Sequence, residues 1–249
     1  MSDRTRQYAA VSSATQAVQD APIGSSSLAS PRSSRNSNFS QSSDFDEKPI
    51  PTLEPAVVAM GISTGGPSAL ERILPRFPGN LPVPILIVQH MPSGFIAPLA
   101  ERLNSLCSIS VREANQHQLI EPGVAYLAPA GSHMRVLKSL TDRGARIVLD
   151  PRRGNALHMP SIDELMKSVS VLYRNRAIGV IMTGMGSDGA SGIAAIYNQG
   201  GLTIGQDETS CTVYGMPRVC AELGVLTRIV TLVHIPNVIV SAIRNPKQT

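Results

Sequence analysis

The chain has 249 residues, of which 42% are hydrophobic and 16% charged, enough for one hydrophobic core with an additional tail. No apolar run approaches the roughly 18–20 residues that a membrane-spanning helix needs, so we expect no membrane insertion. The net charge of +4 is scattered outside residues 1–50, and the chain has only four Phe, five Tyr and no Trp, which argues against stacking on nucleic acid and favours an acidic protein partner.

The N-terminus and the cysteines indicate a cytoplasmic protein. The first ten residues, MSDRTRQYAA, lack the apolar segment of a signal peptide. The three cysteines, Cys107, Cys211 and Cys220, show no metal-binding spacing and are typical of reduced thiols. We expect all three to be small buried residues, and a thiol nucleophile is the less favoured alternative.

Composition divides the chain into three parts. Residues 1–53 contain thirteen serines and few apolar side chains, so we predict a disordered tail. Residues 54–245 are predicted to form one α/β domain with a mainly parallel sheet, because short apolar runs alternate there with helical segments. Residues 246–249 are a short C-terminal tail. The expected strands are 56–60, 84–89, 123–128, 177–182 and 201–205.

The expected helices lie between these strands. Pro67 is suited to the first position of a helix over 68–74, and a second helix covers 95–106. Ser161 and Glu164 have the spacing of a capping box at the start of a helix over 162–173. Residues 133–149 flank the turn sequence TDRG and predict a small antiparallel hairpin.

Three of the expected strands are followed by residues of catalytic type. Ser63 follows the first strand in the G-x-S-x-G pattern GISTG, His90 follows the second, and Asp188 follows the fourth. Because active sites of parallel sheets form outside the carboxyl ends of the strands, the three residues can meet there. Serine, histidine and aspartate are the groups that nucleophilic acyl transfer requires.

Each residue also has a simpler structural interpretation. Ser63 alone is equally well explained as a turn residue, His90 as a hydrogen-bonded structural histidine, and Asp188 as the cap of a helix over 190–199. Their joint placement favours the catalytic interpretation. The remaining histidines, His117, His133, His158 and His234, lack metal-ligand spacing, so we expect no metal.

The loop that contains Asp188 also supports a competing hypothesis. Residues 184–189 fit G-x-G-x-x-G between a strand and a helix, and Asp207 follows at about the distance of a ribose-binding acid. A dinucleotide-binding oxidoreductase is therefore an alternative. Against it, Asp188 would place a carboxylate inside the phosphate-binding turn.

Several long motifs resemble the catalytic domain of the CheB chemotaxis protein-glutamate methylesterases. They extend from about Ala56 to near the C-terminus and include GISTGGPSAL, QHMPSGFIAPLAERLN, PGVAYLAPAGSHM, HMPSIDELM, VIMTGMGSDGASG and TSCTVYGMPR. The resemblance implies a nucleophile at Ser63, a base at His90 and an orienting carboxylate at Asp188. It also implies an oxyanion-stabilising backbone amide at Met185 and a site-lining role for Thr64.

The resemblance further implies a three-layer α/β/α fold with a doubly wound sheet and no cofactor. The implied reaction is hydrolysis of glutamate γ-methyl esters on methyl-accepting chemotaxis receptors, with methanol released and, in many members, deamidation of receptor glutamines. Members usually carry an N-terminal receiver domain, which about 53 serine-rich residues cannot form. The chain is thus a stand-alone member or a piece of a longer product. A non-catalytic receptor-docking module of the same fold is a third hypothesis.

Overall fold

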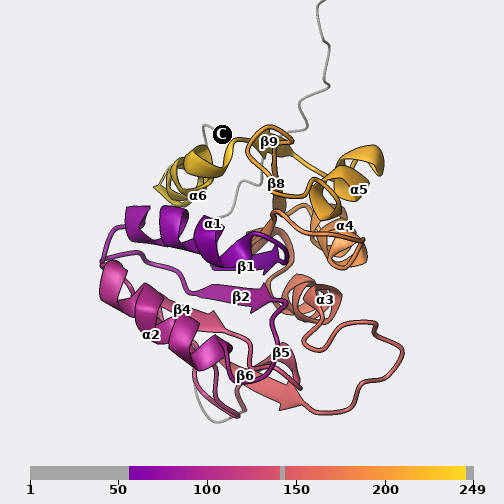
Figure 1. The fold of residues 1–249 in the computed structure, drawn as a ribbon. Helices are drawn as coiled ribbons and strands as arrows, with labels where there is room; N and C mark the ends of the chain where they lie inside the picture. Colours follow the sequence, from indigo (N-terminus) through magenta and orange to yellow (C-terminus); the bar gives the residue numbers. More distant parts are fainter. Residues whose placement is uncertain (1–55, 141–143, 245–249) are drawn as a thin grey trace, which may run out of the picture. The chain divides into compact units, whose positions relative to one another are not determined.

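A computed structural model describes residues 56–140 and 144–244 (Figure 1). The predicted tails at 1–53 and 246–249, and most of the hairpin turn, lie outside the described residues. The predicted α/β class is confirmed, because a parallel seven-stranded sheet is covered by helices and a separate two-stranded antiparallel hairpin lies beside it.

The seven strands of the main sheet are ordered β3-β4-β2-β1-β7-β8-β9, and every neighbouring pair is parallel. In chain order they span Val57–Ile62 (β1), Ile85–Gln89 (β2), Ser110–Glu113 (β3), Val124–Leu127 (β4), Ala177–Ile181 (β7), Leu202–Gln206 (β8) and Arg228–Val230 (β9). The first half of the chain adds strands on one side of β1, and the second half adds them on the other. The topological switch point therefore lies at β1 and β7.

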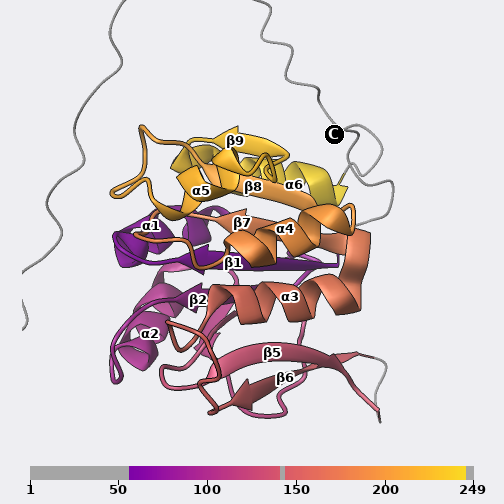
Figure 2. The same ribbon diagram turned by 90° about the vertical axis from the view of Figure 1, so that its right-hand side faces the viewer.

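Helices cover both faces of the sheet, and a separate apolar core fills each side (Figures 1 and 2). Helices α1 (Gly66–Ile73), α2 (Ile96–Leu106) and α6 (Ile235–Arg244) pack on one face, and α3 (Ile162–Tyr173), α4 (Ala190–Asn198) and α5 (Met216–Glu222) on the other. Alternate residues of β1 point to opposite cores, with Val58 and Met60 in the first and Val57 and Ala59 in the second. The predicted three-layer arrangement is therefore confirmed.

The hairpin pairs β5 (His133–Lys138) with β6 (Ala145–Asp150), in the place that the sequence predicts. It packs beside α3, at the lower edge of Figure 2. Three short 3₁₀ helices complete the described elements, at Leu74–Arg76 (η1), Arg174–Arg176 (η2) and Leu232–His234 (η3). Within residues 56–140 and 144–244, no helix combines the length and the apolar character needed to cross a membrane.

Two details of the helix starts differ from the predictions. Helix α1 begins at Gly66, so Pro67 occupies the second helical position rather than the first. The Ser161 hydroxyl caps α3 by accepting from the Glu164 amide at 3.4 Å, as a capping box requires. The reciprocal bond is absent, because the Ser161 amide donates to the buried ring of His133 and the Glu164 carboxylate accepts from Arg135.

Candidate active site

The site lies at the carboxyl end of the sheet, where the loops after β1, β2 and β7 meet. These strands are direct neighbours, with β1 between β2 and β7. The loop after β1 contains Ser63, the loop after β2 begins at His90, and the loop after β7 contains Asp188. The topological switch point, where open α/β sheets bind their ligands, therefore coincides with the three residues that the sequence singles out.

Ser63 lies in a tight turn between β1 and α1, and glycines allow this turn to form. The Ser63 amide donates to the Thr183 carbonyl at 3.0 Å, which ties the turn to the end of β7. Gly65 has a φ of +82°, in the left-handed region that favours glycine. A methyl group on Gly184 would lie 2.7 Å from the Ser63 Cβ, so the loop after β7 packs directly against the serine.

His90 and Asp188 form a hydrogen-bonded pair. The His90 Nε2 lies 2.8 Å from the Asp188 Oδ2, and the two side chains are 11% and 9% exposed. Although 98 residues separate them in the chain, parallel strands bring both loops to the same edge. The sequence prediction that these two side chains meet therefore agrees with the geometry.

The Asp188 carboxylate lies against the N-terminus of α3. Its oxygens accept from the amides of Ile162 at 2.8 Å and Asp163 at 3.2 Å, and from the Ser161 hydroxyl at 2.9 Å. Burial would raise the pKa of Asp188, but the hydrogen bonds from His90 and from the start of α3 outweigh it and lower the pKa to about 2. Asp188 is therefore an ionised acceptor at neutral pH.

An ionised Asp188 determines the tautomer of a neutral His90 ring. Because a carboxylate only accepts, Nε2 must carry the proton and Nδ1 must present a lone pair. The Nδ1 atom is buried and has no hydrogen-bond partner among the described residues. The Ser63 hydroxyl makes no hydrogen bond to His90 among the described residues either.

Gln89 holds the backbones of Ser63 and His90 together. Its side chain is 1% exposed, and its Nε2 donates to the Ser63 carbonyl at 3.0 Å and to the His90 carbonyl at 2.9 Å. The His90 amide also donates to the Ile62 carbonyl at 3.0 Å, which extends the β1–β2 ladder to the site. Sequence reasoning missed Gln89, because a glutamine at the end of an apolar run has no distinctive pattern.

His158 is a second residue that the sequence prediction did not place in the site. Its ring stacks on His90, with centroids 4.2 Å apart and planes inclined by 21°. Burial lowers the pKa of His158, and the neighbouring His90 ring lowers it further. The neutral ring thus covers one face of the His90 imidazole. The sequence signal that could have identified His158 was its position three residues before Ser161, in the loop that leads to α3.

Thr64 follows Ser63 in the turn between β1 and α1, and Met185 lies in the glycine loop between β7 and α4. Thr64 is exposed, and its carbonyl accepts from the Thr183 hydroxyl at 2.9 Å. The Met185 side chain is 75% exposed. Both neighbours of Met185 in the chain are glycines, and the Gly184 carbonyl accepts from the amides of Gly215 and Met216. Among the described residues, the Met185 amide makes no backbone hydrogen bond, which leaves this donor for a ligand.

The thiols and the remaining histidines form no competing catalytic centre. Burial raises the pKa of Cys107 to about 11 and those of Cys211 and Cys220 to about 12, so all three remain protonated at neutral pH. Cys220 is buried as expected, whereas Cys107 and Cys211 are only half-buried. No cluster of three His, Cys, Asp or Glu side chains suited to a metal ion occurs in the described ranges.

Comparisons with known proteins show the family to which the chain belongs. The sequence model of the CheB methylesterase domain matches residues 58–239. The chain belongs to the CheB methylesterase family. It is similar to the crystal structure of the Thermotoga maritima CheB methylesterase catalytic domain, with a TM-score of 0.73 and 34% identity over 76% of this chain and 99% of that chain.

Two curated relatives carry the name protein-glutamate methylesterase/protein-glutamine glutaminase. The protein of Desulfotalea psychrophila is 46% identical over 190 residues, covering 76% of this chain and 52% of the relative. Protein 2 of Hahella chejuensis is 48% identical over 182 residues, covering 72% and 48%. The chain therefore spans about half the length of the curated relatives that it matches.

CheB-family membership does not support the alternative of a dinucleotide-binding oxidoreductase. The geometry of the loop at 184–189 gives the physical reason. The Asp188 carboxylate in this loop accepts hydrogen bonds from the amides at the start of α3. Asp188 also directly precedes Gly189, the N-cap residue of α4. A pyrophosphate at this turn would face that negative charge.

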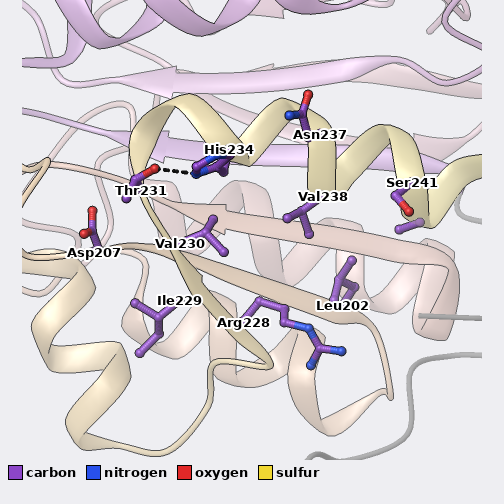
Figure 3. Close-up of a pocket in the computed structure, with 11 residues that line it drawn as sticks. Leu202, Asp207, Arg228, Ile229, Val230, Thr231, His234, Asn237, Val238 and Ser241 are labelled. Atoms are coloured by element: carbon purple, nitrogen blue, oxygen red, sulfur yellow. Dashed lines mark hydrogen bonds between the residues drawn. The ribbon is translucent and has the colours of Figure 1, made fainter.

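A separate cavity of about 610 Å³ lies between β9 and α6 and contains none of the predicted catalytic residues (Figure 3). Its walls are mainly apolar, with contributions from Leu202, Val230 and Val238. Asp207, the acid of the dinucleotide hypothesis, lines this cavity. Its carboxylate accepts from Thr209 and Ser210 of its own loop, so it is engaged as a turn residue.

Proposed function

We propose that this CheB-family chain is a serine esterase that hydrolyses glutamate γ-methyl esters on methyl-accepting chemotaxis receptors. The observation that carries the proposal is the buried His90–Asp188 pair beside the Ser63 turn, with the His90 Nδ1 unpaired. The names of the relatives support the methyl ester as substrate and a receptor glutamine as a second substrate. A cytoplasmic location stays a prediction from the sparse free cysteines.

In the proposed first step, Ser63 Oγ attacks the γ-carbonyl carbon while His90 Nδ1 accepts the hydroxyl proton. Asp188, bonded to Nε2, keeps the ring in the required orientation and stabilises the imidazolium. The Met185 amide donates to the oxyanion, and Thr64 lines the adjacent surface. The His90 proton then passes to the departing methoxide, which leaves as methanol.

In the second step, water attacks the acyl-enzyme while His90 again accepts a proton. Collapse of the tetrahedral intermediate returns the proton to Ser63 and releases the glutamate. For a glutamine substrate the leaving group is ammonia, so one site serves both reactions. The lack of a Ser63–His90 hydrogen bond among the described residues fits this scheme, because catalytic hydrogen bonds often form fully only when substrate is bound.

The test is methanol release from a receptor fragment that carries radiolabelled methyl groups. We expect release by the wild-type chain and a loss of at least about 10³-fold in Ser63→Ala, with an unchanged circular dichroism spectrum. The third hypothesis, a non-catalytic receptor-docking module, requires the opposite result, which is binding of the receptor with no methanol from either protein. Ammonia release from an unmethylated fragment tests the glutaminase reaction separately.

A further inference from the structure

A pocket of about 430 Å³ opens beside the catalytic pair, and it contains basic residues for which the proposed mechanism has no role. Its walls come from the loop between β6 and α3, the first turns of α3 and the glycine loop after β7. In Figure 1 the first of these segments leaves β6 and returns to α3 as a long loop. Asp188 and His158 both line the pocket, so it is continuous with the active site.

The carboxylates that line this pocket are already engaged. Asp188 bonds to His90 and to the start of α3. Glu164 forms an ion pair with Arg135 at 2.6 Å, and the Asp163 Oδ1 accepts from the Gly192 amide at 2.7 Å. Among the described residues, none of the three forms an ion pair with Arg153 or Lys167.

Two of the four cations that line the pocket lack an acidic partner. Arg135 and Arg152 both bond to Asp150. Arg153, by contrast, donates only to the backbone carbonyls of Ala156 at 3.4 Å and Leu157 at 3.0 Å. Lys167 is exposed on α3 and forms no ion pair among the described residues. The pocket thus presents two positive charges that form no ion pair with a described carboxylate.

The buried ring of His133 links the backbone of Arg153, through Ser161, to Asp188. The His133 ring is 1% exposed, and it bonds to the Arg153 carbonyl through Nε2 at 3.3 Å and to the Ser161 amide through Nδ1 at 3.1 Å. Ser161 in turn donates to Asp188. The Arg153 charge also contributes to the lowered pKa of His158, after burial and the His90 ring. The backbone of this basic loop is therefore fixed relative to the site.

We propose that Arg153 and Lys167 form a subsite that binds an acidic side chain of the protein substrate. The proposal rests on the methylesterase function proposed above. On a helical substrate, residues three or four positions apart lie on one face, about 5–6 Å apart at Cβ. A carboxylate at that spacing from the esterified glutamate would enter the pocket while the ester reaches Ser63. The subsite would select esters within acidic helices.

Matched helical peptides test the subsite. Each peptide carries one glutamate γ-methyl ester, with Glu, Gln or Lys four residues before or after it. Because a charge-assisted hydrogen bond is made equally in the ground and transition states, we expect the Glu peptide to have about a tenfold lower KM than the Gln peptide in at least one of the two positions. The Lys peptide should be poorest, and added salt should reduce the preference.

Three variants test whether the positive charges of Arg153 and Lys167 cause the preference for the Glu peptide. Arg153→Gln should remove most of the preference for the Glu peptide, measured as the ratio of the KM values for the Gln and Glu peptides. Arg153→Lys keeps the charge and should retain the preference, and Lys167→Gln should weaken it without disturbing the loop. Arg76→Gln is the matched control, because Arg76 is also exposed, also donates to a backbone carbonyl, and lies in η1 beyond the far end of α1 from Ser63.

The outcomes distinguish this inference from the proposed function. Equal KM values for Glu and Gln peptides in the wild-type protein, with hydrolysis that requires Ser63, would overturn the subsite and leave the esterase proposal intact. A preference that survives both Arg153→Gln and Lys167→Gln would also overturn it. Failure of the wild-type protein to hydrolyse any peptide or methylated receptor fragment would overturn the esterase proposal, and the substrate subsite with it.

Discussion

Asp188 is in contact with both His90 and the N-terminus of α3. Its Oδ2 accepts from His90 and from the Ile162 amide, and its Oδ1 accepts from the Ser161 hydroxyl. In the proposed mechanism the charge of this carboxylate, rather than its shape alone, sets the tautomer of His90. Charge and shape can be separated by an isosteric substitution.

We predict that Asp188→Asn lowers kcat by about 10³-fold or more, with little change in KM for a methylated receptor. An amide can present its NH₂ to Nε2 and so favour the wrong tautomer, in which Nδ1 carries the proton and cannot accept one from Ser63. Steady-state kinetics on the receptor fragment measure both constants. A kcat within about tenfold of wild type in a folded Asp188→Asn protein would exclude the orienting role.

A second prediction concerns the ring of His158. Burial and His90 lower its pKa, so the ring stays neutral down to a lower pH than a free histidine with its usual value of 6.5. In the reaction His90 becomes positively charged, and a protonated His158 stacked on it would oppose that charge. Wild-type kcat/KM should therefore include a loss below pH 6.5 that comes from protonation of His158.

Substitutions of His158 can isolate this effect. His158→Phe keeps a flat ring without the charge, so it should retain most of the activity at pH 7 and lose less than wild type as the pH falls. His158→Ala removes the ring and should lower kcat by about tenfold, a magnitude typical of a positioning contact. Identical pH–rate profiles for all three proteins would show that the stack has no part in catalysis.

At the scale of elements, the start of α3 serves both the fold and the site. Ser161 caps the helix by accepting from the Glu164 amide, and its hydroxyl donates to Asp188. We predict that Ser161→Ala lowers the free energy of unfolding by about 1 kcal/mol, the usual loss of an N-cap. The same change should also lower kcat several-fold, because Asp188 loses a donor.

Ser170 provides a control on the same helix. It is also buried, and its hydroxyl donates to the Lys167 carbonyl within α3, away from the site. Ser170→Ala should lower the free energy of unfolding measured in urea, because this hydrogen bond is lost, and it should leave kcat unchanged. If the two serine variants lower kcat equally, the helix start has no special connection to the catalytic pair.

The close packing of the loop after β7 against the nucleophile turn gives a prediction at Gly184. A methyl group there would lie 2.7 Å from the Ser63 Cβ and 2.5 Å from the Met216 Sδ, so Gly184→Ala must displace the serine or the loop. We expect kcat to fall by at least about tenfold. Gly144→Ala is the control, because among the described residues its added methyl would meet only Leu119, at 3.7 Å. Equal activity of the two variants would contradict the packing argument.

The sequence predicted the elements that carry a strong apolar pattern. The strands β1, β2, β4, β7 and β8 are recognisable because they are buried on both faces, as parallel strands between two helical layers must be. The edge strands β3 and β9 escaped prediction, since each is short and half-exposed. Helices α5 and α6 were likewise not predicted; α5 spans only seven residues, Met216–Glu222.

For the site, the sequence predicted which residues meet at the carboxyl edge of the sheet but not how they are supported. The Asp188–His90 contact follows from parallel strand order. The Gln89 bridge, the His158 stack and the His133 link depend on side-chain packing across loops distant in sequence, which no local pattern reveals.

At the scale of the whole molecule, the fold places Ser63, His90 and Asp188 at the switch point of the sheet, and the proposed reaction uses only these groups, backbone amides and water. We therefore predict that dialysis against a strong chelator leaves methanol release unchanged and that calorimetry detects no binding of NAD or NADP. The control for the chelator is the same protein with Mg²⁺ restored. A tenfold loss that the metal reverses, or dinucleotide binding in the micromolar range, would require a different account of the loop at 184–189.

The central claim is that Ser63 is a nucleophile activated by His90, and covalent labelling tests it without any choice of receptor. A fluorophosphonate phosphonylates serines that a neighbouring base has activated, because the serine oxygen displaces fluoride from phosphorus, and peptide mass spectrometry identifies the modified residue. The proposed triad predicts an adduct on Ser63 in the wild-type chain, none on the thirteen serines of residues 1–53, and none in Ser63→Ala or His90→Ala. An adduct on another serine, or methanol release that persists in Ser63→Ala, would contradict the claim.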